Sequence, residues 1–329
     1  MTDQPQTSTT TPSSETLAEL CERILSTVEG RVLGQREAAE GLLATYLAGG
    51  HTLLEGVPGI GKTLLANTFA AALGLDFQRV QFTPDLMPAD VVGTNIFRSA
   101  TGQFELLRGP IFTRMLMADE INRTPPKTQS ALLEAMQERQ VTIDGERHPL
   151  DDTFFVVATQ NPVEFEGTYP LPEAQLDRFA TRIQMQLPPP ESEIELYRRA
   201  VHHHHAAGEW DPPPQSVVSE AEARTLRGCV GRIHVSDELL TYLAQLAERT
   251  RKSPHVELAI SPRGALALLA AARAAAVLEG RDHLIPDDLK RFLAPCWGHR
   301  MLLTAEAELE GLSIRRLLDE VAEQVEVPR

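Results

Sequence analysis

The feature that most constrains this chain is the run Gly56-Val57-Pro58-Gly59-Ile60-Gly61-Lys62-Thr63, which has the form of a phosphate-binding loop. The apolar segment 52–54 predicts a buried strand before it, and segment 64–70 predicts a helix after it. Glycines let the backbone form a nest of N–H groups that face phosphate oxygens, and the positive end of the helix adds to the attraction. The sequence therefore predicts a nucleotide-binding site.

Each position of the loop has an expected role. We expect Lys62 to pair with the β- and γ-phosphates and the Thr63 hydroxyl to take a coordination position of Mg²⁺. The alternative, a glycine-rich turn that matches the pattern by chance, is disfavoured by the strand and helix on either side. ATP and Mg²⁺ are thus the expected cofactors, and the expected nucleotide-binding residues are Gly56, Pro58, Gly59, Ile60, Gly61, Lys62, Thr63 and Leu64.

An acidic pair follows an apolar strand downstream of this loop. The segment 115–118 predicts a strand, and Asp119 and Glu120 come directly after it. A carboxylate at the carboxyl edge of a parallel sheet can hold the Mg²⁺ shell, which we assign to Asp119. Glu120 is the candidate general base for the attacking water. The alternative is an ordinary acidic strand end, but phosphoryl transfer requires such a pair.

Three further residues are candidates for catalysis. Asn161 follows the strand predicted at 154–159 and could bond the γ-phosphate and the water, although an asparagine before a proline is also common in turns. Arg178 is predicted to begin a helical segment before the last strand, and Arg263 to begin a helix of a second domain. Either arginine could form a surface ion pair, or could supply positive charge to the γ-phosphate in the transition state.

The order of strand and helix signals indicates an α/β protein. Strands are predicted at 52–54, 77–82, 115–118 and 154–158, with a last strand through Ile183, Met185 and Leu187. A helix is predicted over 128–139, and such alternation favours a parallel sheet covered on both faces. After Pro188-Pro189-Pro190 only helix start signals are evident, at Ser219, Ser236 and Ser261. We therefore expect a disordered tail at 1–14, an α/β nucleotide-binding core at 15–190 and a helical domain at 191–329.

Two segments resemble hairpins and a third invites a metal hypothesis. Segment 95–104 and segment 140–146, with its Asp144-Gly145 turn signal, are read either as hairpins or as surface loops. The run 202–205 consists of four histidines, whose side chains point in different directions and so do not form one closed metal site. A solvated loop is expected there.

Composition and charge limit the classes of function. The net charge of −15 argues against a broad basic surface that coats nucleic acid, although a local basic pore stays open. Cys21, Cys229 and Cys296 are widely spaced and fit neither a disulfide framework nor a zinc site. No secretory signal or membrane-spanning run is evident, so the expected location is the cytoplasm without membrane insertion.

The longer motifs resemble the MoxR family of AAA+ ATPases over nearly the whole chain, from about residue 33 to 303. The most specific stretches are 109–112, 118–123 and 125–141, which include Ala118-Asp119-Glu120-Ile121-Asn122-Arg123. Further matches are at 81–85, 158–162, 167–179 and Ser261-Pro262-Arg263. A phosphate-binding loop alone indicates only a nucleoside triphosphatase, whereas this set is specific.

The resemblance implies an AAA+ core with a parallel sheet, a small all-α lid domain and assembly into a ring, usually a hexamer. It implies that Gly34 and Gln35 lie near the adenine, and that Asn161 is sensor 1, Arg178 the arginine finger and Arg263 sensor 2. Segment 95–104 would be the helix-2 insert, and 140–148 a hairpin before sensor 1. The resemblance also implies a chaperone-like remodeler, often with a separate partner that carries a von Willebrand factor A domain.

Four functions compete on the sequence alone. The leading one is ATP-driven, chaperone-like remodelling or activation of protein complexes. A nucleic-acid translocase and a magnesium-chelatase-type motor subunit are alternatives that use a similar core. A non-catalytic ATP-binding scaffold is disfavoured because Glu120 and Arg178 are both present.

Overall fold

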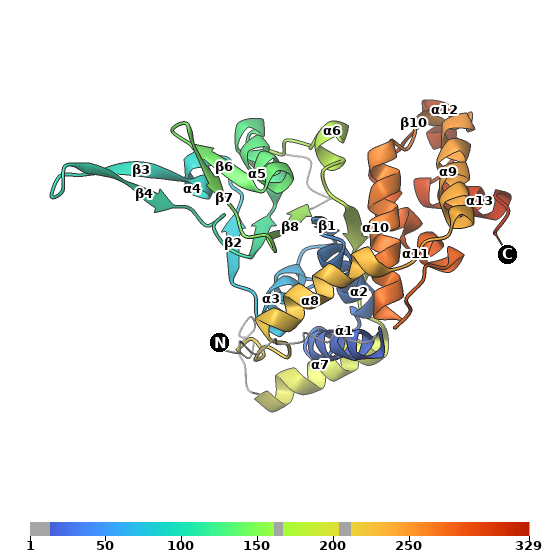
Figure 1. Ribbon diagram of the computed structural model, residues 1–329, viewed down its shortest axis with the longest axis horizontal. Helices are drawn as coiled ribbons and strands as arrows, with labels where there is room; N and C mark the ends of the chain where they lie inside the picture. Colours follow the sequence, from blue (N-terminus) through green and yellow to red (C-terminus); the bar gives the residue numbers. More distant parts are fainter. Residues whose placement is uncertain (1–13, 161–166, 204–211, 329) are drawn as a thin grey trace, which may run out of the picture.

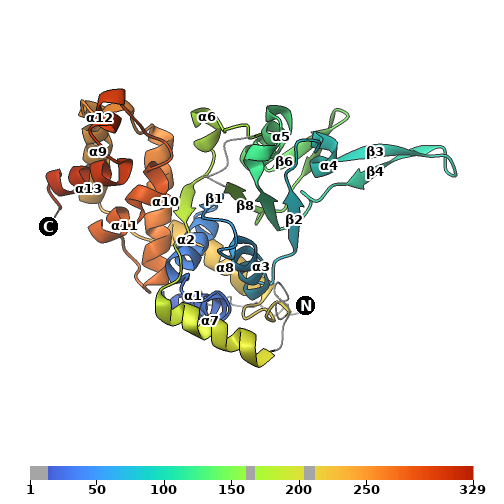
Figure 2. The same cartoon turned by 180° about the vertical axis from the view of Figure 1, so that it is seen from behind.

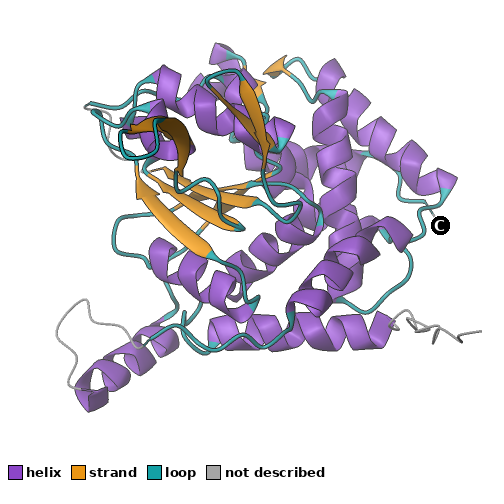
Figure 3. Cartoon of the chain, turned by 60° about the vertical axis from the view of Figure 1, so that its left-hand side comes forward, coloured by secondary structure: helices purple, strands orange, loops and turns teal. Residues whose placement is uncertain are grey.

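A five-stranded parallel sheet forms the centre of the molecule (Figures 1 and 3). The structure is a computed structural model that describes residues 14–160, 167–203 and 212–328. The strand order is β2-β5-β8-β1-β9, so a crossover separates every pair of neighbouring strands. The strands are β1 (Thr52–Glu55), β2 (Phe77–Gln81), β5 (Met115–Asp119), β8 (Phe155–Gln160) and β9 (Thr181–Gln184). The predicted α/β core is confirmed.

Both faces of the sheet are buried at its inner strands β5, β8 and β1, which explains why these strands read as apolar runs. Phe155 and Val157 of β8 pack with the helices of one layer, and Val156 and Ala158 pack with the other. The first layer consists of α1 (Ser14–Glu29), α2 (Arg36–Leu47) and α3 (Lys62–Ala72). On the second face lies α5 (Pro126–Glu138). The sequence predicted α3 and α5 but not α1 and α2.

Two antiparallel hairpins extend from the core, at the two segments that the sequence left open between hairpins and surface loops. The first, β3 (Gly93–Arg98) with β4 (Gln103–Arg108), is longer than the predicted segment 95–104 and projects away from the body (Figures 1 and 2). It follows the short helix α4 (Pro88–Val92). The second, β6 (Gln140–Ile143) with β7 (Glu146–Pro149), turns at Asp144 and Gly145, whose φ angles are 50° and 87°. Positive φ at both residues is what a tight two-residue hairpin turn requires.

The last strand of the sheet was predicted too far along the chain. β9 begins at Thr181, and Leu187 is 70% exposed rather than part of an alternating strand. The Ala180 N–H donates to the carbonyl of His51, which begins the pairing with β1, and three prolines from 188 on remove the N–H donors that a longer strand would need. Arg178 also differs from expectation: it follows the short helix α6 (Glu173–Leu176) instead of beginning a helix.

The chain beyond Pro190 is mainly helical, and its predicted start signals are confirmed. Ser219, Ser236 and Ser261 each cap a helix by accepting a backbone N–H with the side chain. A short antiparallel pair, β10 (Val256–Leu258) with β11 (Leu302–Leu303), was not predicted. The helices are α7 (Pro190–His203), α8 (Glu220–Cys229), η2 (Val230–Arg232), α9 (Asp237–Lys252), α10 (Pro262–Leu278), α11 (Pro286–Trp297), α12 (Ala305–Leu309) and α13 (Ile314–Gln324).

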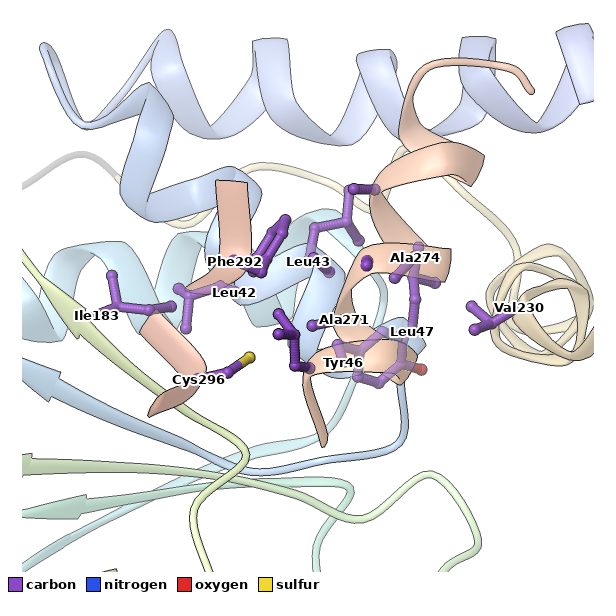
Figure 4. Packing of buried hydrophobic residues seen from close by; sticks show 14 of the residues in the cluster. Leu42, Leu43, Tyr46, Leu47, Ile183, Val230, Ala271, Ala274, Phe292 and Cys296 are labelled. Carbon is purple, nitrogen blue, oxygen red and sulfur yellow. The ribbon is translucent and has the colours of Figure 1, made fainter. Parts of the chain in front are cut away.

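The helix α10 packs directly against the core. Ala271 and Ala274 of α10 lie against Leu43 and Leu47 of α2 in one continuous apolar cluster (Figure 4). Small residues on α10 let the two helices approach closely, which places the lid beside the edge strand β9 (Figure 1). The first two residues of the histidine run, His202 and His203, end α7, and the rest of the run lies outside the described residues.

Among the described residues, no helix is both long enough and apolar enough to cross a bilayer.

His51 is a buried histidine between two layers of the core, and its burial makes the stability of the fold depend on pH. Its ring bonds the Met136 carbonyl through Nε2 and accepts the Val156 N–H through Nδ1, which requires the neutral form. Burial lowers the pKa of His51 to about 4, while the bond to Met136 opposes the shift. An unfolded histidine titrates near pH 6.5. Between that pH and about 4, the unfolded state therefore binds a proton that the folded state does not bind.

Stability should therefore be fully present above pH 6.5 and fall as the pH decreases toward 4. Between pH 7 and pH 5 the titration of this one residue should lower the free energy of unfolding by about 2 kcal/mol. Urea unfolding of the protein and of His51→Gln at both values measures the effect: the variant should lose less stability on acidification. Equal losses in the two proteins would contradict the assignment.

Candidate nucleotide-binding site

The predicted phosphate-binding loop connects strand β1 to the N-terminus of α3, as the pattern indicated. Gly59 and Gly61 have φ angles of 80° and 99°, which side chains disfavour. An added Cβ at either position would meet no atom within 4 Å, so the space above the loop is open. The two glycines are thus required by the backbone conformation rather than by crowding, and the conformation keeps the loop concave.

Lys62, the first residue of α3, folds back over this loop. Its Nζ donates to the carbonyl of Gly56 at 2.5 Å and approaches that of Val57 at 3.4 Å. Burial lowers the pKa of Lys62, and the carboxylates of Asp119, Glu120 and Glu55 oppose that shift. A half-buried amine held among three acidic groups is placed to exchange its carbonyl partners for phosphate oxygens.

Asp119 ends β5 next to the loop, and both of its carboxylate oxygens have partners. Oδ1 accepts the hydroxyl of Thr159 at 2.5 Å, and Oδ2 accepts Nε and Nη2 of Arg79 at 3.0 and 2.6 Å. The β5–β8 register pairs Ala118 with Ala158, which places Thr159 beside Asp119. The sequence predicted Asp119 for metal binding but not its contact with Arg79.

Glu120 leaves the sheet in the left-handed region, with a φ of 56°, which is uncommon for a residue with a side chain. Its N–H donates to the Thr159 hydroxyl at 2.9 Å. Its Oε2 accepts the Gln81 amide at 2.7 Å and lies 3.1 Å from Nε of Arg123. The strained backbone turns the carboxylate out of the strand direction, and two side-chain donors hold it there.

One cavity brings most of the predicted residues together. It has a volume of about 370 Å³, and its lining includes Lys62, Thr63, Asp119 and Glu120. Hydroxyl and carboxylate oxygens of this kind are the hard ligands that Mg²⁺ prefers, so Thr63 and Asp119 fit such an ion. The other lining residues are Pro58, Gly59, Gly61, Leu64, Thr159 and Gln160.

Gly34 and Gln35 lie at a neighbouring part of the core, around the segment that follows β9. Gln35 is buried and donates from Nε2 to the Gln186 carbonyl at 2.7 Å. Gly34 has a φ of 71°, and a Cβ there would lie 2.8 Å from Cδ of Pro189. The same segment reaches the phosphate loop, because a Cβ at Gly56 would lie 3.2 Å from Cβ of Met185.

The structure does not bring the two candidate arginines into the phosphate cavity. Arg178 is half-buried and lines a separate groove of about 490 Å³ that also includes Glu134 and Glu138 of α5. Arg263, near the start of α10, is 49% exposed and lies 3.8 Å from Asp177. Asn161 lies outside the described residues.

Several site residues were missed, although the sequence carried a signal for two of them. Arg79 and Gln81 alternate along β2, and the parallel pairing sets Gln81 opposite Asp119. Two polar residues on one face of a strand next to the acidic pair could have been recognised as its partners. Thr159 stands before the predicted Asn161, but its role depends on the register between β5 and β8, which the sequence does not show.

Comparison with known proteins identifies the family. Residues 51–181 match the family described as ATPase family associated with various cellular activities (AAA), and residues 248–321 match the AAA lid domain. The chain is 40% identical to the chaperone MoxR1 of Mycobacterium tuberculosis over 94% of this chain and 82% of that protein. It is 46% identical to the uncharacterized protein YeaC of Bacillus subtilis over 90% and 91%.

A third relative and a solved structure indicate the same family. The protein MoxR of Paracoccus denitrificans is 32% identical over 92% of this chain and 94% of that protein. A crystal structure of a candidate ATPase from Cytophaga hutchinsonii superposes with a TM-score of 0.87, with 39% identity, and covers 96% of this chain and 97% of that one. Together with the phosphate loop and its acidic pair, these matches show that the chain is an ATPase and belongs to the MoxR family of AAA+ ATPases.

Proposed function

We propose that ATP is hydrolysed in the cavity of about 370 Å³ between the phosphate loop and the carboxyl ends of β5 and β8. The observation that carries this assignment is the convergence of Lys62, Thr63, Asp119 and Glu120 on one cavity, although they come from two segments of the chain. Each supplies a group that phosphoryl transfer uses.

Each of these side chains has a defined task. Lys62 leaves the carbonyl of Gly56 and binds the β- and γ-phosphates. Thr63 and Asp119 hold Mg²⁺, which neutralises charge on the phosphates when bound. Glu120 accepts the proton of the attacking water, with Gln81 and Arg123 orienting its carboxylate. To hold the ion, Asp119 would give up the bond that its Oδ2 accepts from Arg79.

The remaining predicted residues complete the site in our proposal. Gly34 and Gln35 lie against the adenine in this proposal, because the segment after β9 that they contact also reaches Gly56 at the start of the phosphate loop. Asn161, two positions after Thr159 in the sequence, senses the γ-phosphate in this proposal. Arg263 approaches the nucleotide of its own subunit from the lid, and the boundary between core and lid falls near residue 190.

Arg178 acts on the nucleotide of a neighbouring subunit in a ring, which we propose is a hexamer. Arg178 lines a groove other than the phosphate cavity of its own subunit, which supports action across an interface. A second subunit docked on that groove would receive the guanidinium at its γ-phosphate.

The work done by ATP is proposed to be chaperone-like remodelling or activation of protein complexes. The relative MoxR1 bears the name chaperone, and the net charge of −15 disfavours nucleic acid as the partner. A separate protein with a von Willebrand factor A domain is the proposed partner. We place the protein in the cytoplasm, because Cys21, Cys229 and Cys296 are all unpaired thiols.

Glu120→Gln should separate binding from hydrolysis. A carboxamide cannot accept the proton of the water, so ATP turnover should fall by about 10²–10⁴-fold while ATP affinity is kept. Lys62→Ala should instead lose tight binding, and Lys252→Ala, on the exposed face of α9, should change neither property. Calorimetry and phosphate release measure the two quantities. Near-normal turnover of Glu120→Gln would show that another group is the base.

Arg178→Ala should bind ATP normally and hydrolyse it about 10³–10⁵-fold more slowly. When it is mixed with Glu120→Gln, some interfaces combine an intact Glu120 with an intact Arg178, so activity should reappear. Turnover is measured across mixing ratios under conditions of subunit exchange, with Arg316→Ala, at an exposed position of α13, as the control. Absence of recovery would mean that Arg178 acts within its own subunit or has only a structural role.

The partner is tested by affinity purification with the Glu120→Gln variant. In ATP this variant should retain a von Willebrand factor A protein, and the partner should be released in ADP, since nucleotide state sets the shape of the ring. Recovery of nucleic acid in place of protein, with binding that weakens steeply as salt is raised, would favour the translocase.

A further inference from the structure

Two adjacent lid residues, His299 and Arg300, hold the backbone on both sides of Arg178. Nε2 of His299 bonds the Phe179 carbonyl at 2.9 Å. The Arg300 guanidinium donates to the carbonyls of Asp177, Phe179 and Ala180 at 3.1, 2.6 and 3.0 Å. Residues 177–180 of the core are thus bonded to the segment that follows α11, more than 100 residues further along the chain. The position of the proposed finger depends on where the lid lies.

An ion pair between a buried guanidinium and a partly buried carboxylate strengthens this connection. Nε of Arg300 donates to Oδ1 of Asp177 at 2.7 Å, and the Arg300 side chain is only 4% exposed. A buried guanidinium is costly unless its N–H groups are bonded and its charge is compensated. The carbonyls and the Asp177 carboxylate satisfy both conditions, so the loop 177–180 cannot move freely away from Arg300.

Asp177 also faces Arg263, the candidate catalytic arginine in the lid. Nε of Arg263 lies 3.8 Å from Oδ2 of Asp177, and Arg263 is 49% exposed. This contact is longer and more exposed than the pair with Arg300, so it is the weaker of the two. Asp177 therefore contacts Arg263, which is proposed to sense the nucleotide. It also directly precedes Arg178, which is proposed to act on the nucleotide of the neighbouring subunit.

We propose that Asp177 and Arg300 are positioning residues that couple the nucleotide of one subunit to the arginine it presents to the next. The inference rests on the proposed roles of Arg178 and Arg263. When Arg263 turns to the γ-phosphate, Asp177 loses its weaker partner. Because Arg300 still binds the loop to the lid, movement of the lid carries Arg178 with it. ATP in one subunit thereby sets the rate of hydrolysis in its neighbour.

Arg300→Lys tests the coupling, because it keeps the charge beside Asp177 but loses the planar set of donors. The matched control is Arg273→Lys, since Arg273 also bonds two carbonyls, those of Gly231 and Ile233, away from Arg178. We expect Arg300→Lys to bind ATP normally and to turn over about 10- to 100-fold more slowly, as a small displacement of a catalytic group does. Arg273→Lys should keep normal turnover.

Mixing Arg300→Lys with Glu120→Gln distinguishes the proposal from a purely structural role. The Glu120→Gln subunit binds ATP and presents a correctly held Arg178, so turnover should recover as it does for Arg178→Ala. Recovery with Arg178→Ala but not with Arg300→Lys would overturn the coupling and leave the finger assignment intact. Recovery with neither would overturn both.

A second measurement needs no change at Arg300 and so decides the matter even if that variant unfolds. Hydrogen exchange is followed in a peptide spanning 177–180 of Glu120→Gln, where the N–H groups of Arg178 and Phe179 bond Gln175 and Leu176. Exchange of these amides should change when Mg²⁺ and ATP are added, and should not change when Arg263→Ala is also present. Unaltered exchange in Glu120→Gln, with ATP binding shown by calorimetry, would overturn the proposal.

Discussion

The parallel pairing of β8 with both β5 and β1 is the constraint on which the site depends. Its register sets Ala118 beside Ala158 and Leu54 beside Thr159, so the phosphate loop and the acidic pair leave the sheet at the same edge. The Thr159 hydroxyl then bridges the Asp119 carboxylate and the Glu120 N–H. A shift of one residue in either pairing would turn these side chains to the opposite face of the sheet. Because both faces of β8 are buried, such a shift is unfavourable, and the same packing that stabilises the fold also fixes the positions of the site residues.

The charged groups of the site are already satisfied by partners within the chain. Lys62 binds the Gly56 carbonyl, Asp119 binds Arg79, and Glu120 binds Gln81 and Arg123. Such pairing lowers the cost of keeping several charges close together in a half-buried cavity. In the proposed mechanism ATP and Mg²⁺ would therefore bind by exchange: phosphate oxygens would replace the carbonyl at Lys62, and Asp119 would give up the guanidinium of Arg79 to hold the ion.

The sequence predicted those features that depend only on residues close together in the chain. The phosphate loop, the acidic pair and the helix caps at Ser219, Ser236 and Ser261 each depend on a few neighbouring positions. The helical spacing of Leu17, Ile24 and Val28 would also have sufficed for α1, whereas α2 is apolar on nearly all sides and lacks a clear period.

Contacts between distant segments could not be predicted in the same way. Arg79 meets Asp119 only because β2 lies beside β5, and Arg300 meets Asp177 only because α10 and α11 pack on the core. Strand order and lid placement follow from packing of the whole chain, and no local pattern records them. For the same reason the sequence marked Arg178 as a candidate but could not show that it lies away from its own phosphate cavity.

The most direct test of this account is a crystal structure of the Glu120→Gln variant with ATP and Mg²⁺. We expect Lys62 to have left the Gly56 carbonyl for the β- and γ-phosphates. Arg79 should have left Asp119, and the ion should lie between Thr63 and Asp119. A nucleotide bound elsewhere, or bound with the Arg79–Asp119 pair intact and the metal away from Thr63, would contradict the assignment of this cavity as the site of hydrolysis.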